Sequence, residues 1–130
     1  MKINTKLLFL FAILIIVDQI AKNISAASFC NPNIAWSIPI APTIFYFAWF
    51  AIIAALGYFF FRTESFNQKL FLIFVFSGAV SNIIDRIRLG CVIDYIDLKI
   101  WPVFNLADVY IAIGIIFILI FNFQCLKIDH

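Results

Sequence analysis

Two aspartates, Asp94 and Asp108, have the surroundings that acid–base chemistry needs. Asp94 lies in Cys91–Leu98, a segment rich in β-branched and aromatic residues, which is typical of a strand. Strand alternation places Asp94 on the same apolar face as Val92 and Ile96. A carboxyl group on such a face is desolvated, and desolvation raises its pKa. We therefore expect Asp94 to hold a proton more readily than an ordinary aspartate.

Asp108 follows Asn105, which precedes an apolar run and suits a helix N-cap. Asp108 then takes the third helical position, where the positive helix end favours its ionised form. If the two carboxyl groups lie within about 5 Å, their charges repel by about 3 kcal/mol at an effective dielectric near 20. One shared proton is then favoured, so one group can accept a proton from water while the other donates to a carbonyl oxygen. That is aspartic-peptidase chemistry, although helix capping alone would also explain Asn105 and Asp108.

Further polar residues stand at the ends of apolar segments. Asn82, Asp85 and Arg86 have the i, i+3, i+4 spacing of one helix face, which is equally compatible with an interfacial salt bridge. Asp18 and Lys22 close the first apolar run, where an interfacial turn with a snorkelling lysine is the alternative. Asp97 falls on the opposite strand face from Asp94, so we interpret it as ordinary solvated charge.

The composition requires lipid as the solvent. Apolar residues make up 65% of the chain, charged residues make up 12%, and the mean hydropathy is +1.09. A soluble domain of 130 residues could not bury that much apolar surface. The net charge of +2, without any basic run, does not favour nucleic acid as a partner.

Four apolar segments predict a membrane all-α bundle of four transmembrane helices, forming a single domain over residues 1–130. The expected helices cover about residues 3–24, 43–61, 70–87 and 106–123. The first could instead be a secretory signal with a small-residue cleavage region at Ser25-Ala26-Ala27. Residues 25–42 contain three prolines and predict an extramembrane loop, in which Phe29–Ser37 could pair as a short strand.

Four spans put both ends of the chain on one side of the membrane. Basic residues divide five to four between the sides, whereas five aspartates all fall opposite the termini. With the termini in the cytoplasm, the polar cluster faces outward.

The cysteines and the histidine limit the possible site chemistry. Cys30, Cys91 and Cys125 are odd in number and form no CxxC pair, which favours apolar packing over a disulfide or a metal site. The only histidine, His130, is the last residue, so a Ser-His-Asp triad or a histidine-based zinc site is not expected.

These residues together resemble the lipoprotein signal peptidases, the type II signal peptidases of bacteria. Four blocks carry the resemblance, in order along the whole chain: Asp18–Lys22, Asn31–Ser37, Gly78–Arg86 continued by Gly90–Ile96, and Phe104–Asp108. The last two blocks are the specific ones.

The resemblance implies four transmembrane helices, a small extramembrane β-sheet and a catalytic dyad of Asp94 and Asp108. The implied reaction removes the signal peptide from a diacylglyceryl-modified prolipoprotein, on the amino side of the lipidated cysteine. Neither a metal nor another cofactor is implied, and the enzyme is expected to act as a monomer in the bacterial cytoplasmic (inner) membrane, with its site on the outer face. The substrate-binding or site-supporting residues would be Asp18, Lys22, Asn31, Asn82, Asp85, Arg86 and Asn105.

The chain also departs from the family pattern. The interval from Asp18 to Asn31 is short, so part of the outer sheet is expected to be missing. Asn33 stands where the family has glycine, and Ser77 and Ser81 replace glycines before Asn82. Asparagine tolerates a positive φ better than most residues, which favours preservation of the turn.

Two other functions are compatible with parts of the sequence, and a third is disfavoured. The polar cluster could be an interhelical clasp in a binding or assembly protein. Ser25 and Lys22 have a spacing that permits a Ser-Lys peptidase. A transporter is disfavoured, because the helices lack mid-span carboxylates and central Gly or Pro breaks.

Overall fold

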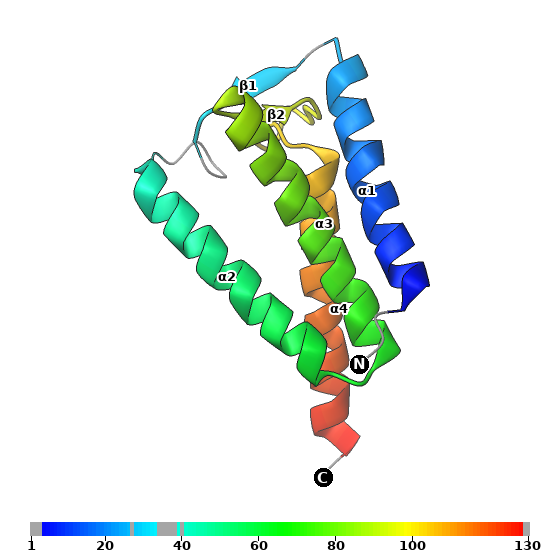
Figure 1. Cartoon of the computed structure of the whole chain (residues 1–130). Coiled ribbons are helices and arrows are strands. Elements are labelled where there is room, and N and C mark those ends of the chain that lie inside the picture. Colours follow the sequence, from blue (N-terminus) through cyan, green and yellow to red (C-terminus); the bar gives the residue numbers. More distant parts are fainter. Residues whose placement is uncertain (1–3, 27, 34–38, 40, 129–130) are drawn as a thin grey trace.

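A computed structural model describes residues 4–26, 28–33, 39 and 41–128 of the chain. Four long helices and two short strands make up the fold (Figure 1). In chain order these elements are α1 (Thr5–Ile24), β1 (Phe29–Asn31), α2 (Pro42–Arg62), α3 (Phe66–Leu89), β2 (Val92–Asp94) and α4 (Leu106–Ile128).

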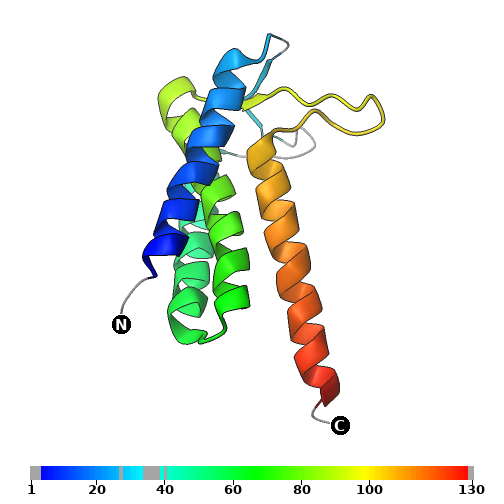
Figure 2. The ribbon, with the colours of Figure 1, turned by 90° about the vertical axis from the view of Figure 1, so that its right-hand side faces the viewer.

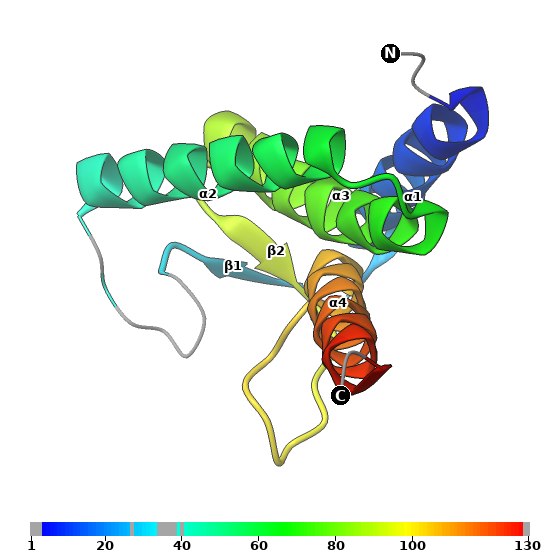
Figure 3. The ribbon, with the colours of Figure 1, turned by 90° about the horizontal axis from the view of Figure 1, so that it is seen from below.

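Helix α3 is central and contacts each of the other three helices. The strands lie at one end of the bundle, whereas the start of α1, the α2–α3 connection and the end of α4 lie at the other (Figures 1 and 2). Helix α2 packs against α3 and stays apart from α4 when the bundle is viewed along its length (Figure 3). The site residues therefore gather at the sheet end, where α1 and α3 finish and α4 begins.

The helices carry the surface of a membrane protein. Helices α1, α2 and α3 are each long and apolar enough to cross a membrane, and α4 adds a shorter apolar stretch over Leu106–Phe121. Helix α2 buries none of its residues, and Phe47 and Phe50 are 75% and 69% exposed. Such a surface is stable against lipid rather than water. The predicted membrane fold, mostly helical with a small sheet, is confirmed in this outline.

The helix ends follow capping residues more than hydropathy. The expected third helix starts at residue 70, whereas α3 starts at Phe66 because the Ser65 side chain caps it by accepting from the backbone N–H of Gln68 at 3.5 Å. Helix α3 ends at Gly90, whose φ of +76° is the left-handed conformation that favours glycine. The hydropathy of the sequence therefore did not predict the polar first turn of α3.

Two glycines let α3 and α4 approach closely. A Cβ atom on Gly78 would lie 2.3 Å from the backbone oxygen of Ala107, and one on Gly114 would lie 2.5 Å from Cγ2 of Val75. Small residues at a helix crossing allow this backbone approach in membranes. The contact at Gly78 sets the start of α4 against the end of α3, where the site is formed.

The sheet pairs β1 and β2 in antiparallel register, with Phe29 opposite Asp94 and Asn31 opposite Val92. The strand expected over residues 91–98 forms only over β2, and Ile96 makes a separate bridge with Phe104. The strand expected over residues 29–37 forms as β1, while residues 34–37 lie outside the described part of the chain.

Cys30 and Cys91 form a disulfide, so their interpretation as packing residues was wrong. The two cysteines are 61 residues apart in sequence, but strand pairing brings their Cα atoms to 5.5 Å. Neither an odd cysteine count nor the lack of a CxxC motif reports on a contact made across two strands.

Candidate active site

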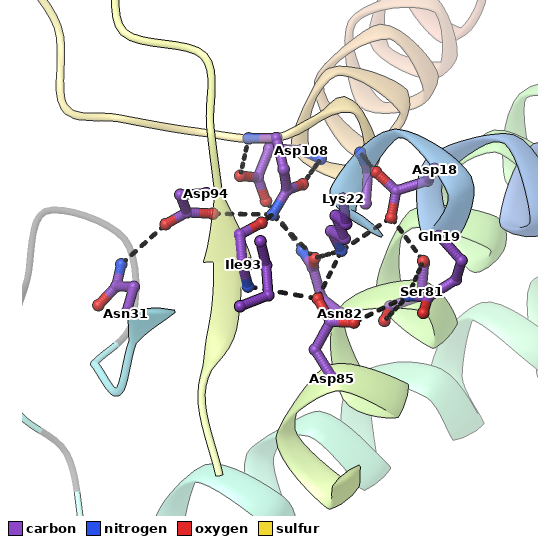
Figure 4. A network of polar contacts seen from close by, with 12 residues as sticks. Asp18, Gln19, Lys22, Asn31, Ser81, Asn82, Asp85, Ile93, Asp94 and Asp108 are labelled. Atoms are coloured by element: carbon purple, nitrogen blue, oxygen red, sulfur yellow. Dashed lines mark hydrogen bonds and ion pairs between the residues drawn. The ribbon is translucent and has the colours of Figure 1, made fainter. Parts of the chain in front are cut away.

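Asn105 contacts both of the aspartates expected to form a dyad. Figure 4 shows these aspartates, Asp94 and Asp108, among the polar side chains around them. Its side-chain Nδ2 donates to Oδ1 of Asp94 at 2.8 Å, and its backbone N–H donates to Oδ2 of Asp108 at 3.2 Å. Asn105 is fully buried. Asn105 thus holds two carboxyl groups that come from different elements, β2 and α4.

The start of α4 positions Asp108. The Asn105 side chain accepts from the backbone N–H of Asp108 at 2.9 Å, and the Asp108 carboxylate accepts from the backbone N–H of Asn105 in return. This is a reciprocal N-cap, as the spacing of the two residues predicts. The N-terminal dipole of α4 favours the ionised form of a carboxylate at this position.

Strand β2 positions Asp94, which is only 3% exposed. Burial raises the pKa of Asp94 above its usual range, and the charge of Asp108 acts in the same direction. Hydrogen bonds from Asn31 and Asn105 oppose that rise, as does the charge of Lys22. The Asn31 Nδ2 atom donates to Oδ2 of Asp94 at 3.1 Å, so both carboxyl oxygens of Asp94 have an amide donor.

Asn82 joins the two aspartates to the buried charges behind them. Its Nδ2 donates to Oδ1 of Asp108 at 2.9 Å, while its Oδ1 accepts from Asn105 at 3.1 Å and from Lys22 Nζ at 2.9 Å. The amide orientation of Asn82 is therefore fixed by partners on α1 and at the start of α4.

Behind Asn82 lies a buried charge cluster formed by Asp18, Lys22 and Asp85. Lys22 Nζ is 2.7 Å from Oδ2 of Asp18 and 2.7 Å from Oδ2 of Asp85, and the three residues are at most 5% exposed. Asp18 also accepts from the backbone N–H of Ala107 at 2.9 Å. Because Ala107 is in the first turn of α4, the cluster ties the end of α1 to the helix that carries Asp108.

Two further residues complete the cluster and were not among the expected site residues. Gln19 donates to Oδ1 of Asp85 at 2.8 Å, and Ser81 donates to Oδ2 of Asp18 at 2.5 Å. Buried carboxylates need such donors to offset their desolvation. A signal was present in the sequence, since Ser81 is a polar residue inside an apolar helix, one turn before Asp85.

The three residues expected on one face of α3 divide between two environments. Asn82 and Asp85 face the cluster, whereas Arg86 donates to the backbone oxygen of Asn33 at 2.9 Å and places its guanidinium 4.5 Å from the ring centre of Phe45. Asp97 is paired with Lys99 and partly exposed, and this partner lowers the pKa of Asp97, as expected for solvated charge.

An open pocket of ≈ 520 Å³ lies beside the two aspartates. Asp94, Asp108, Asn31, Asn82 and Arg86 form its polar side. Its apolar side comes from residues 101–104 of the loop before α4 and from residues 111 and 112 of α4. Among the described residues, no group of three or more His, Cys, Asp or Glu side chains is arranged to hold a metal ion. The polar groups that line the pocket include two carboxyl groups, side-chain amides and a guanidinium.

The sequence matches the family model of signal peptidase (SPase) II over residues 10–124. It is 34% identical over 136 residues to the lipoprotein signal peptidase of Microcystis aeruginosa, covering 84% of this chain and 86% of that protein. The corresponding protein of Pelotomaculum thermopropionicum is 33% identical, with 83% and 85% covered.

Other similarities are stronger but shorter. The lipoprotein signal peptidase of Moorella thermoacetica is 54% identical over 48 residues, which span only 32% of that relative's length. That of Halothermothrix orenii is 48% identical over 54 residues, or 37% of its length.

Solved structures share the fold over most of its length. A bacterial membrane enzyme solved by the in meso method at 2.3 Å resolution superposes with a TM-score of 0.83 at 28% identity, covering 92% of this chain and 88% of that chain. A second one, at 1.9 Å resolution, gives a TM-score of 0.78 at 28% identity, with 89% and 91% covered. Since the family model spans most of the sequence and two relatives align over nearly their full length, this chain belongs to the signal peptidase (SPase) II family.

Proposed function

We propose that this protein is a membrane aspartyl endopeptidase that removes the signal peptide from diacylglyceryl-modified prolipoproteins. The cut falls on the amino side of the lipidated cysteine. Family membership supports the class of reaction. The observation that carries the mechanism is the pair of hydrogen bonds by which Asn105 holds Asp94 and Asp108 beside one pocket.

We assign different roles to the two aspartates from their positions in the fold. Asp108 sits at the N-terminus of α4, which favours its carboxylate and suits it to act as the general base. Asp94 is buried, and its raised pKa suits it to hold the proton and act as the general acid. Because the charges interact, the pair titrates as a unit with one shared proton.

The reaction then balances with one water molecule. Asp108 takes a proton from water as the water oxygen bonds to the scissile carbonyl carbon, and Asp94 gives its proton to the carbonyl oxygen. In the second step the C–N bond breaks. The Asp108 carboxyl group protonates the leaving nitrogen of the cysteine, and Asp94 recovers a proton from a hydroxyl of the intermediate.

The surroundings of the pocket fit a lipid-anchored peptide. Its polar side offers amide and guanidinium donors to a peptide backbone, and its apolar side includes residues 111 and 112, one turn along α4 from Asp108. Each buried CH₂ group of an acyl chain contributes about 0.8 kcal/mol to membrane anchoring, so the substrate reaches the enzyme within the bilayer. Arg86 and Asn31 are the groups proposed to position the substrate backbone.

The proposed orientation has four spans, cytoplasmic termini and the pocket on the outer face. The Cys30–Cys91 disulfide supports this arrangement, because disulfides persist in oxidising compartments outside the cytoplasm. The disulfide and the pocket lie at the same end of the bundle, since both involve β1 and β2. In this proposal the enzyme acts as a monomer and uses neither a metal nor another cofactor.

The Ser-Lys alternative finds no support in the surroundings of Lys22. A lysine that acts as a general base must be neutral, whereas Lys22 Nζ lies 2.7 Å from each of two carboxylates and donates to Asn82.

Substituting the aspartates tests the proposal against a non-catalytic clasp. Asp94→Asn and Asp108→Asn keep the size of each side chain but remove the acid and the base. Cleavage of a diacylglyceryl-modified prolipoprotein in mixed micelles should fall by about 10²–10⁴-fold in either variant. Asp97→Asn is the matched control, because Asp97 faces solvent, and it should cleave normally. Full activity in either dyad variant would overturn the mechanism.

A further inference from the structure

The disulfide adjoins the two strand residues that meet in the pocket. Cys30 immediately precedes Asn31 in β1, and Cys91 precedes β2, which ends at Asp94. Asn31 donates to Oδ2 of Asp94 across this pair of strands. A covalent link between the strands therefore lies directly beside a hydrogen bond to the proposed general acid.

Among the described residues β1 pairs with β2 alone, and Arg86 also donates to the backbone oxygen of Asn33 just after the strand. Strand β1 is three residues long, and two-stranded sheets of this kind are marginal in water. Phe29 is 55% exposed and Cys30 is also exposed, so neither anchors β1 in a core. By contrast, Cys91 and Val92 on the partner side are 2% and 4% exposed. The disulfide thus fastens a weakly held strand to a firmly packed one.

We propose that the Cys30–Cys91 disulfide is a positioning element of the peptidase site, which holds the Asn31 amide on Asp94. This inference rests on the proposed function. Cys30 and Cys91 act through Asn31 and are not themselves catalytic.

The effect of losing the Asn31–Asp94 hydrogen bond depends on the charged groups around Asp94. Asp108 of α4, Lys22 of α1 and Arg86 of α3 all interact electrostatically with Asp94, and all three lie on helices. Arg86 also donates to the backbone oxygen of Asn33, two residues after β1. The Asn31 hydrogen bond favours the ionised form of Asp94 and so lowers its pKa against the effect of burial. Releasing Asn31 would raise the pKa of Asp94 further. Since the dyad needs its proton, activity would then persist to higher pH.

The disulfide can be opened chemically. A dithiol reductant breaks the S–S bond by supplying two electrons and two protons, which yields the Cys30 and Cys91 thiols and the cyclic disulfide of the reagent. Exposure of Cys30 gives the reagent access to one sulfur of the bond. Alkylation then keeps the two thiols apart during the assay.

The test compares oxidised enzyme with reduced, alkylated enzyme on a diacylglyceryl-modified prolipoprotein across pH. Loss of the hydrogen bond that positions Asp94 should lower kcat/KM by about tenfold near neutral pH, and the basic limb of the profile should move to higher pH. A role in folding alone would lower the rate equally at every pH. An unchanged rate and profile would overturn the inference, as would a loss of helical circular dichroism that accounts for the whole drop in rate.

Variants isolate the effect of the strand link. Cys30→Ser with Cys91→Ser should reproduce the reduced enzyme, whereas Cys125→Ser should match the oxidised parent. In an Asn31→Ala background, reduction should change neither the rate nor the basic limb, because the contact is already absent. A further tenfold loss in that background would contradict the proposed route through Asn31. Failure of these tests leaves the dyad intact, since loss of cleavage in Asp94→Asn and Asp108→Asn is measured separately.

Discussion

The ammonium group of Lys22 lies 2.9 Å from Oδ1 of Asn82. Through this contact the buried charge cluster of α1 and α3 reaches the proposed catalytic pair, because the other amide atom of Asn82 is bonded to Asp108. Two carboxylates and one ammonium have been removed from water to build that connection. Such a cluster costs stability unless every member stays paired, so its presence fits a requirement for precise placement of Asn82.

Removing the charge of Lys22 should strongly destabilise the protein. Lys22→Met leaves Asp18 and Asp85 buried without their cation, which should lower the free energy of unfolding by about 3–5 kcal/mol. Thermal unfolding in detergent measures the effect. Lys99→Met removes a solvent-exposed pair and should leave the melting temperature unchanged.

A second substitution separates charge from packing at the same site. Adding Asp85→Asn to Lys22→Met removes one of the unpaired charges, so the double variant should recover part of the lost stability. Equal melting temperatures for the single and double variants would contradict the role assigned to the cluster.

The close approach of α3 to α4 should make Gly78 intolerant of a side chain. In Gly78→Ala the new Cβ atom would lie 2.3 Å from the backbone oxygen of Ala107, so the first turn of α4 must shift away from α3. Asp108 lies in that turn and bonds to Asn82, so peptidase activity should fall by about tenfold or more together with stability.

Gly57→Ala provides the comparison within the same protein. Gly57 is helical, and a Cβ there meets no atom within 4 Å. This variant should be as stable as the parent or more stable by up to about 1 kcal/mol, with normal activity. Gly78→Ala with parental activity would show that the α3–α4 contact does not position Asp108.

The sequence predicted the N-cap formed by Asn105 and Asp108 but not the longer-range contacts around the two aspartates. The N-cap spacing of Asn105 and Asp108 is local, so it could be read directly from four consecutive residues. The bond from Ser81 to Asp18 and the disulfide of Cys30 with Cys91 join segments about 60 residues apart. Pairs of this kind depend on helix rotation and strand register, which hydropathy and residue spacing leave undetermined.

The extent of the outer sheet shows the same limit. Alternation over residues 91–98 predicts one strand, yet pairing ends at Asp94 because β1 supplies only three partners. The later residues pair instead through Ile96 with Phe104, which brings the chain back to α4. A strand is formed by its neighbour as much as by its own residues.

Asn105 should be essential for activity beyond its effect on helix stability. Asn105→Ala removes the side-chain cap on the Asp108 backbone N–H and the donor to Asp94 Oδ1, while the backbone N–H that donates to the Asp108 carboxylate remains. Peptidase activity should fall by about 100-fold or more, and unfolding should become easier by about 1–2 kcal/mol.

Ser65→Ala is the matched cap variant, because Ser65 caps α3 at the end of the bundle opposite the pocket. It should lose a similar or smaller amount of stability and keep full kcat/KM. If both variants lose activity only in proportion to their unfolded fraction, Asn105 has no role in holding the aspartates.

The pH dependence of stability should reveal the state of Asp94. Burial raises the pKa of Asp94 above its ordinary value of 3.8, so the folded state binds a proton here that the unfolded chain releases. The stabilising contribution of this proton is complete below pH 3.8 and is lost as the pH rises through the folded pKa. Asp94→Asn, which stays neutral, should therefore melt at a higher temperature than the parent at pH 8.

That difference should shrink as the pH falls below 3.8, where Asp94 becomes protonated in both states of the parent. For a chain of this size about 1 kcal/mol corresponds to roughly 3–6 °C, which scanning calorimetry resolves. Taking the difference between the two proteins at each pH cancels the acid sensitivity that they share. A constant difference across pH would mean that folding leaves the pKa of Asp94 unchanged, which would contradict its assignment as the group that holds the proton in the free enzyme.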